Sequence, residues 1–73
     1  MAQLNHEQYE KLERAVARGD RIIVNRRGTE FVLVPLALVY RAGREVIESR
    51  NPTTGDALSL YVDELDSIEP IAR

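Results

Sequence analysis

The chain has 73 residues, no cysteine, one histidine (His6) and a formal net charge of −2. A chain of this length is expected to form one domain, 1–73, whose small core buries about 60% of the unfolded surface. The composition excludes disulfides, thiolate catalysis and cysteine-ligated metal sites. The low net charge argues against avid nucleic-acid binding, which depends on many basic contacts.

The sequence carries no signal for a membrane or for export. No apolar run approaches the roughly 18 residues that a membrane span requires, and the first residues lack the basic and apolar regions of a signal peptide. We therefore expect a soluble cytoplasmic protein with no membrane partner.

The charges are unevenly distributed along the chain. Residues 1–50 hold nine Lys/Arg against seven Asp/Glu, whereas residues 51–73 hold one base and five acids. A basic patch beside an acidic edge would fit this pattern. The alternative is a mixed and fully solvated surface.

A helix is predicted over about 6–18. Asn5 can serve as its N-cap, and Gln8 three residues later completes a capping-box-like pattern. Gly19 suits the position after the last helical turn, where the backbone reverses. The apolar stripe consists of Tyr9, Leu12 and Val16, with Ala15 at its margin.

Strand-like runs fill the remainder, over about 20–72. They are predicted at 21–25, 29–34 with an extension through 36–40, 44–50, 58–62 and 68–71. Pro35 cannot donate to a strand ladder, so it marks a bend or an edge. The acidic run 63–66 is predicted to form a single 3₁₀ turn, with Leu65 pointing inward and Asp63 capping the turn.

This order predicts a mainly β (α+β) fold, in which an N-terminal helix precedes a five-stranded, strongly bent Sm/SH3-like barrel. Several runs are apolar on both faces, so either the helix or a partner must cover the second face. The predicted core consists of Leu12, Val16, Ile22, Val24, Phe31, Leu33, Leu38, Val46, Leu58, Leu60, Leu65, Ile68 and Ile71.

Three segments carry a family resemblance: VNRRGTE at 24–30, VPLALVY at 34–40 and LYVDELDSI at 60–68. Together they resemble the WYL domain of bacterial transcriptional regulators, an Sm-like barrel, over about two-thirds of the chain. The resemblance implies binding of a regulatory ligand or an oligonucleotide. At the position of the family's Trp-Tyr-Leu motif, this chain has Glu45-Val46-Ile47. The helix-then-five-strand order is also similar to Sm and Lsm proteins, which build rings through their edge strands.

One set of residues could bind an anion. Arginine suits bidentate contacts to phosphate or carboxylate, and a tyrosine next to an arginine could stack on a base. The alternative is a set of separate, solvated arginines in turns. The candidate ligand-binding residues are Arg26, Arg27, Tyr40, Arg41, Arg44 and Arg50.

No catalytic or metal site is expected. Glu45 and Glu48 have opposite parity on a strand and should face different sides. His6 has no partner nearby in sequence, and the acids of 63–66 are expected to be solvated. We expect no enzymatic activity and no cofactor.

The leading hypothesis is a non-enzymatic small binding module that assembles as a homo-oligomer through exposed edge strands. Its ligand would be an anion, a nucleotide or a nucleic-acid segment, bound in a regulatory role. The alternative is a protein–protein interaction or structural module with no small ligand, whose partner is a heterologous protein. An antitoxin-like chain that is stable only in complex is a third hypothesis.

Overall fold

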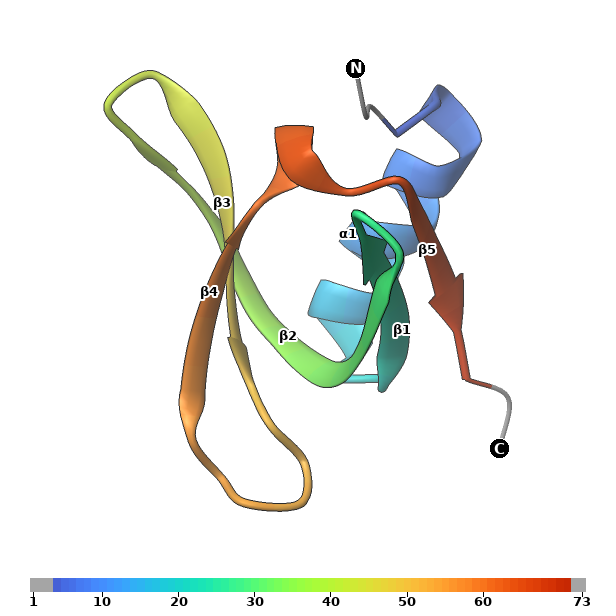
Figure 1. Cartoon of the computed structure of the whole chain (residues 1–73), viewed down its shortest axis with the longest axis vertical. Helices are drawn as coiled ribbons and strands as arrows, with labels where there is room; N and C mark the ends of the chain where they lie inside the picture. The colour runs from blue at the N-terminus through green and yellow to red at the C-terminus, as the bar shows by residue number, and fades with distance from the viewer. Residues whose placement is uncertain (1–3, 72–73) are drawn as a thin grey trace.

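The computed structural model describes residues 4–71, and Figure 1 shows their course. One helix precedes five strands, and a 3₁₀ turn joins the last two. The elements are α1 (His6–Arg18), β1 (Ile22–Arg26), β2 (Thr29–Arg41), β3 (Arg44–Arg50), β4 (Ala57–Tyr61), η1 (Val62–Glu64) and β5 (Ser67–Pro70). The predicted mainly β, α+β chain with an N-terminal helix is confirmed.

The five strands form one antiparallel sheet in the order β4-β3-β2-β1-β5. Strands β1 to β4 pair with their neighbours in sequence, whereas β5 crosses over to pair with β1. Strands β4 and β5 are therefore the two edges of the sheet. Because these edges do not pair with each other, the barrel is not closed.

Strand β2 bends sharply where Pro35 lies. Its pairing with β3 runs Val34↔Arg50 below the bend and Ala37↔Glu48 above it, so the register shifts by one residue. The extra residue is Leu36, which forms a β-bulge and strengthens the local twist. The predicted bend is confirmed, and the runs 29–34 and 36–40 belong to one long strand that curves from one half of the sheet to the other (Figure 1).

Helix α1 has the caps that its sequence predicts. The Asn5 side chain accepts a hydrogen bond from the Gln8 N–H at 2.8 Å, and Gly19 adopts a φ of 71°. The helix buries Leu12 and Ala15 and packs against β2 and β5. Within residues 4–71, no helix combines the length and the apolar character of a membrane span.

The core lies between α1 and the concave face of the sheet. Most of the predicted core is fully buried, whereas Val16, Phe31, Leu38, Leu58 and Ile71 are only partly buried. Ala15 and Ile47 are buried as well, and the core prediction did not include them. The central cluster consists of Leu12, Ala15, Ile22, Val24, Leu33, Ile47, Leu60, Leu65 and Ile68.

Two tight turns and one long loop connect the hairpins. The residue pairs Arg27-Gly28 and Ala42-Gly43 all have positive φ, as hairpin turns of the I′ class require. Both turns lie at the same end of the sheet as η1, whereas the β3–β4 loop, 51–56, lies at the opposite end (Figure 1). We call these two ends the η1 end and the loop end.

Candidate anion-binding surface

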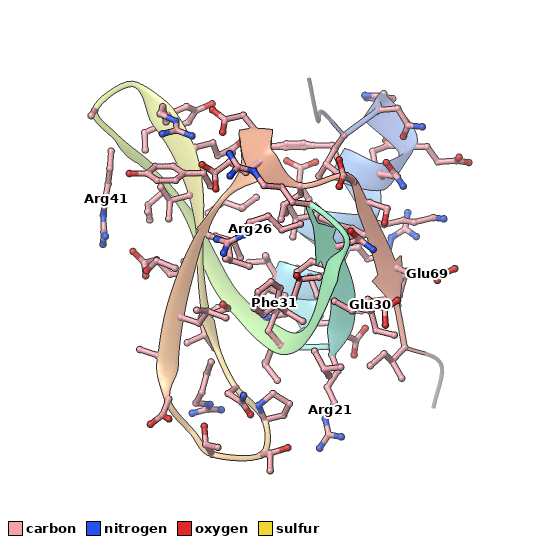
Figure 2. All side chains as sticks on the ribbon, in the orientation of Figure 1. Arg21, Arg26, Glu30, Phe31, Arg41 and Glu69 are labelled. Carbon is pink, nitrogen blue, oxygen red and sulfur yellow. The ribbon has the colours of Figure 1, made fainter. Side chains whose placement is uncertain are left out.

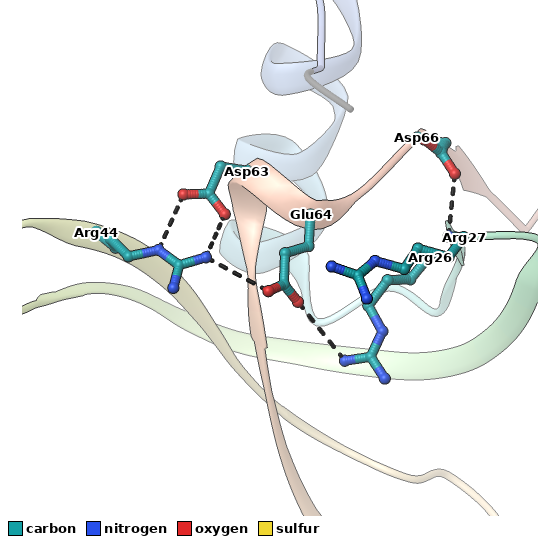
Figure 3. A network of polar contacts seen from close by, with 6 residues as sticks. All are labelled: Arg26, Arg27, Arg44, Asp63, Glu64 and Asp66. Carbon is teal, nitrogen blue, oxygen red and sulfur yellow. Dashed lines mark hydrogen bonds and ion pairs between the residues drawn. The ribbon is translucent and has the colours of Figure 1, made fainter. Parts of the chain in front are cut away.

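Arg44 is held by acids at the η1 end. Its Nε lies 3.0 Å from Oδ2 of Asp63 and its Nη2 lies 2.6 Å from Oδ1, which is a bidentate pair (Figure 3). The same Nη2 lies 3.4 Å from Oε2 of Glu64. The guanidinium also stacks 3.6 Å above the ring centre of Tyr61. The Arg44 guanidinium already bonds two carboxylates along its edge, and the Tyr61 ring covers one of its faces. It is therefore poorly placed to bind a further anion.

Glu64 lies between Arg44 and a second predicted residue, Arg26. The Oε1 atom of Glu64 is 3.9 Å from Nη1 of Arg26. The guanidinium of Arg26 lies 5.4 Å from the ring centre of Phe31. One carboxylate therefore contacts two of the predicted arginines.

Arg27 contributes its backbone to this end of the molecule. Its N–H donates to Oδ2 of Asp66 at 3.0 Å (Figure 3). The Asp66 N–H donates in turn to the Asn25 carbonyl at 2.8 Å. These two bonds fasten the acidic segment to the β1–β2 turn. The Arg27 side chain is exposed, and no ion pair to it is found in residues 4–71.

The pair of Arg44 and Asp63 is charged at neutral pH. The hydrogen bond from Arg44 lowers the pKa of the Asp63 carboxyl below its usual value, and the same bond raises the pKa of Arg44. The prediction that Asp63 caps the 3₁₀ turn is wrong, since η1 has no side-chain cap. The reason is register: Val46 pairs with Tyr61, so Arg44 lies level with Asp63 across the β3–β4 hairpin.

Arg41 is also in contact with an acid, on the outer face of β2 and β3. Its guanidinium forms an ion pair with the carboxylate of Glu48, which accepts a further hydrogen bond from the Ser59 hydroxyl at 2.7 Å. Tyr40 is 73% exposed. Strand alternation turns its ring to the face opposite Arg41. On that face the Tyr9 hydroxyl donates to the carboxylate of Glu45, and this bond raises the pKa of Tyr9.

Arg50 lies at the loop end, far from the acids of η1. It lines an open groove of about 510 Å³ together with Arg21, Val34 and the loop residues 51–55. No ion pair to Arg50 or Arg21 is found in the part of the chain that the structure describes. Sequence reasoning missed Arg21, although the hairpin register could have indicated it.

The six predicted residues thus lie in separate places. Arg26, Arg27 and Arg44 gather at the η1 end, Arg41 lies on the outer face with Glu48, and Tyr40 lies on the other face of β2. Only Arg50 belongs to the loop-end groove. In residues 4–71, no three His, Cys, Asp or Glu side chains are grouped so that they could hold a metal ion.

Comparison with known proteins gives no relative for this chain: no protein-family model, no curated protein and no solved structure matches it.

Proposed function

We propose that this chain is a non-enzymatic binding module with an Sm/SH3-like barrel, which associates with copies of itself and binds an anionic ligand in a regulatory role. The observation that carries the proposal is that the two edge strands, β4 and β5, each have one side without a paired strand. The helix before β1, the five-stranded antiparallel sheet and the 3₁₀ turn before β5 are compatible with an Sm/SH3-like fold and support the proposal.

The two edges differ in how much pairing they offer to a second chain. On β5, the Ile71 N–H donates to the Arg21 carbonyl at 3.1 Å, so alternation turns the nitrogen of Pro70 to the free side, where it has no hydrogen to donate. On β4, the Asn51 N–H donates to the Asp56 carbonyl at 2.9 Å, so the Ala57 N–H and C=O point outward. Strand β4 is therefore the edge better suited to association.

The anion-binding part of the proposal is supported by the arginines that have no acidic partner. Arg21, Arg27 and Arg50 have exposed side chains, and no ion pair to them is found in residues 4–71. Arg26, Arg41 and Arg44 would have to give up Glu64, Glu48 or Asp63 before they could hold a ligand. The unpaired arginines are therefore the favoured ligand-binding groups.

The alternative is a protein-interaction module with no small ligand. Among residues 4–71, four large apolar or aromatic side chains are at least one-third exposed, and this supports the alternative. They are Val32, Leu36, Tyr40 and Tyr61. A heterologous protein could cover these side chains.

Solution mass by light scattering, at low and at high salt, tests self-association. We expect a closed oligomer at micromolar concentrations, and we expect Ala57→Pro to convert it to a folded monomer because proline removes an outward N–H from β4. Ala57→Ser is the matched control, since it keeps that N–H and should keep the oligomer. A folded wild-type monomer throughout the micromolar range at both salt concentrations would refute the association.

Salt dependence separates the two functions. Binding of an anion through arginines weakens steeply as salt rises, whereas an apolar protein interface does not. A partner held equally well at 50 mM and 500 mM salt would favour the protein-interaction alternative.

A further inference from the structure

We propose that the groove at the loop end, between Arg21 and Arg50, binds the phosphate group of a small phosphorylated ligand such as a nucleotide. This inference rests on the anion-binding function proposed above and names the site and the ligand class for it. The groove is formed by Arg21, Val34, Arg50 and the loop residues 51–55, and Arg21 points into the space beside that loop (Figure 2).

The strand register aligns the two arginines. Ile22 pairs with Leu33, so Arg21 lies level with Val34, and Val34 in turn pairs with Arg50. The three residues form one row across β1, β2 and β3, with the two arginines two strand spacings apart, about 10 Å at the backbone. Ile22, Leu33 and Ser49, their neighbours in sequence, are all buried, so alternation turns the whole row to the outer face.

The bulge at Leu36 creates this alignment. Above the bulge Ala37 pairs with Glu48, and that register would place Arg50 opposite Pro35. The one-residue shift moves Arg50 level with Val34 instead, and therefore level with Arg21. Two long arginine side chains, based on either side of a smaller valine, can converge on one anion above it.

The lining of the groove contains two positively charged side chains and no carboxylate. Both arginine side chains are exposed, and within residues 4–71 neither of them forms an ion pair. This contrasts with the arginines Arg26, Arg41 and Arg44, each of which contacts a carboxylate. Two unpaired guanidiniums on one row repel each other, so a shared anion would lower the electrostatic free energy.

The rest of the groove wall comes mostly from the loop 51–55, which is held by its own hydrogen bonds. The Oδ1 atom of Asn51 accepts hydrogen bonds from the N–H groups of Thr53 and Thr54 at 2.8 and 3.1 Å, and the Asp56 N–H donates to the Thr54 hydroxyl at 3.2 Å. The loop amides are therefore used internally. The groups left to donate to a phosphate are the two guanidiniums, the side-chain amide of Asn51 and the hydroxyls of Thr53 and Thr54, since the Thr54 hydroxyl only accepts a bond from the Asp56 N–H.

The dimensions and the surrounding charge favour a small ligand over a nucleic-acid strand. A volume of about 510 Å³ falls in the range of small-molecule sites. The chain as a whole carries a net charge of −2, so an extended polyanion would meet repulsion beyond the groove. Val34 and Pro52 also give the groove an apolar wall, against which a base or another apolar group could pack.

The test is an NMR titration of the ¹⁵N-labelled full chain with three probes: inorganic phosphate, ATP and a single-stranded oligonucleotide. We expect ATP and phosphate to shift the amide signals of residues 21 and 50–55, with ATP binding more tightly. Arg21→Gln and Arg50→Gln should each weaken ATP binding by about tenfold, because each removes a charged donor. Arg50→Lys keeps the charge but loses the bidentate contacts of the guanidinium, so it should weaken ATP binding less than Arg50→Gln does.

Arg14→Gln is the matched control, since Arg14 is exposed on α1 and its removal changes the net charge equally. Equal losses in the control and in the groove variants would overturn the site. Shifts confined to residues 26–28 and 44 would also overturn it, yet they would leave the anion-binding function standing. Tighter binding of the oligonucleotide than of ATP would overturn the small-ligand class. No shift with any of the three probes would overturn both proposals.

Discussion

The two ends of the sheet differ in whether acids contact their arginines, although the Arg27 side chain at the η1 end also has no ion pair in residues 4–71. At the η1 end, Arg26 and Arg44 contact Glu64, and Arg44 also forms a bidentate pair with Asp63. At the loop end, Arg21 and Arg50 line a groove with no carboxylate in its wall. The comparison teaches that arginines in a sequence do not by themselves mark an anion site. An arginine is available to a ligand only where the fold has not already placed a carboxylate of the same chain against it.

The topology explains the difference. Strand β4 runs from the loop end back to the η1 end, so the acids that follow it arrive beside the β1–β2 turn and the start of β3 (Figures 1 and 3). Asp63, Glu64 and Asp66 then contact Arg44, Arg26 and the Arg27 backbone. Three of the five acids in residues 51–73 are thus in contact with the η1 end of the sheet.

The largest expected effect on stability comes from truncating Leu65, the core residue that directly follows the acidic turn η1. Leu65 is fully buried in the core directly after η1. We expect Leu65→Ala to lower the free energy of unfolding by about 3 kcal/mol, through lost burial and the cavity it leaves. Urea unfolding at pH 7 measures this effect.

Leu36→Ala is the control for that variant, because Leu36 is 52% exposed at the bulge. It should change the free energy of unfolding by less than about 0.5 kcal/mol. Equal effects in the two variants would show that η1 is not anchored through Leu65.

The second prediction is that the η1 end will bind an anion once its carboxylates are removed, as is proposed for the loop end. In the double variant Asp63→Asn with Glu64→Gln, Arg26 and Arg44 lose their carboxylate partners. ATP should then bind at the η1 end, with an affinity there about tenfold above that of the wild type. The shifted amide signals of residues 26 and 44 would report the new site.

The control changes the net charge by the same amount elsewhere. Asp56→Asn with Glu69→Gln removes two exposed acids, for neither of which an ion pair is found in residues 4–71. A similar gain in ATP affinity at the η1 end in this control would mean that the overall charge, and not the local ion pairs, prevents the arginines there from binding an anion.

Local features of the fold could be predicted from the sequence. The helix runs from the Asn5 cap to Gly19, because caps and the apolar stripe act within a few residues. The tight turns at Gly28 and Gly43 follow from the need for positive φ. The position of Ile47 was harder, since Val46 next to it is buried too and alternation alone does not say which of them faces the core.

The contacts between distant residues depend on register, which the sequence specifies less directly. Arg44 and Asp63 lie 19 residues apart, and they meet because of the β3–β4 pairing. Counting outward from the 51–56 loop could have predicted that pair. Arg21 and Arg50 align only through the bulge at Leu36, and a one-residue shift next to a proline has no clear signal in a single sequence.

The third prediction concerns the pH dependence of the η1 end. Arg44 lowers the pKa of Asp63 in the folded protein, so this pair contributes stability above the unfolded value of 3.8, and that contribution is lost as the pH falls through the lower folded pKa. The thermal midpoint of Asp63→Asn should therefore fall less between pH 5 and pH 2 than that of the wild type. Asp56→Asn, at the loop end, should follow the wild-type curve. A parallel fall of the Asp63→Asn variant and the wild type would show that the pair adds no acid-sensitive stability.

The smallest effect concerns backbone strain, which also differs between the ends. Among residues 4–71, the non-glycine residues with positive φ are Arg27 and Ala42, each at 52° and both in the tight turns of the η1 end. Asparagine tolerates this conformation better than alanine and is favoured in turns of this class. We expect Ala42→Asn to raise the free energy of unfolding by about 0.5 kcal/mol, measured by urea unfolding. Ala17→Asn, on the exposed face of α1, should lower it instead, because asparagine is the poorer helix former. A gain at residue 42 with a loss at residue 17 would locate the strain in the turn, whereas a loss at both positions would mean that the Ala42 turn carries no strain that asparagine relieves.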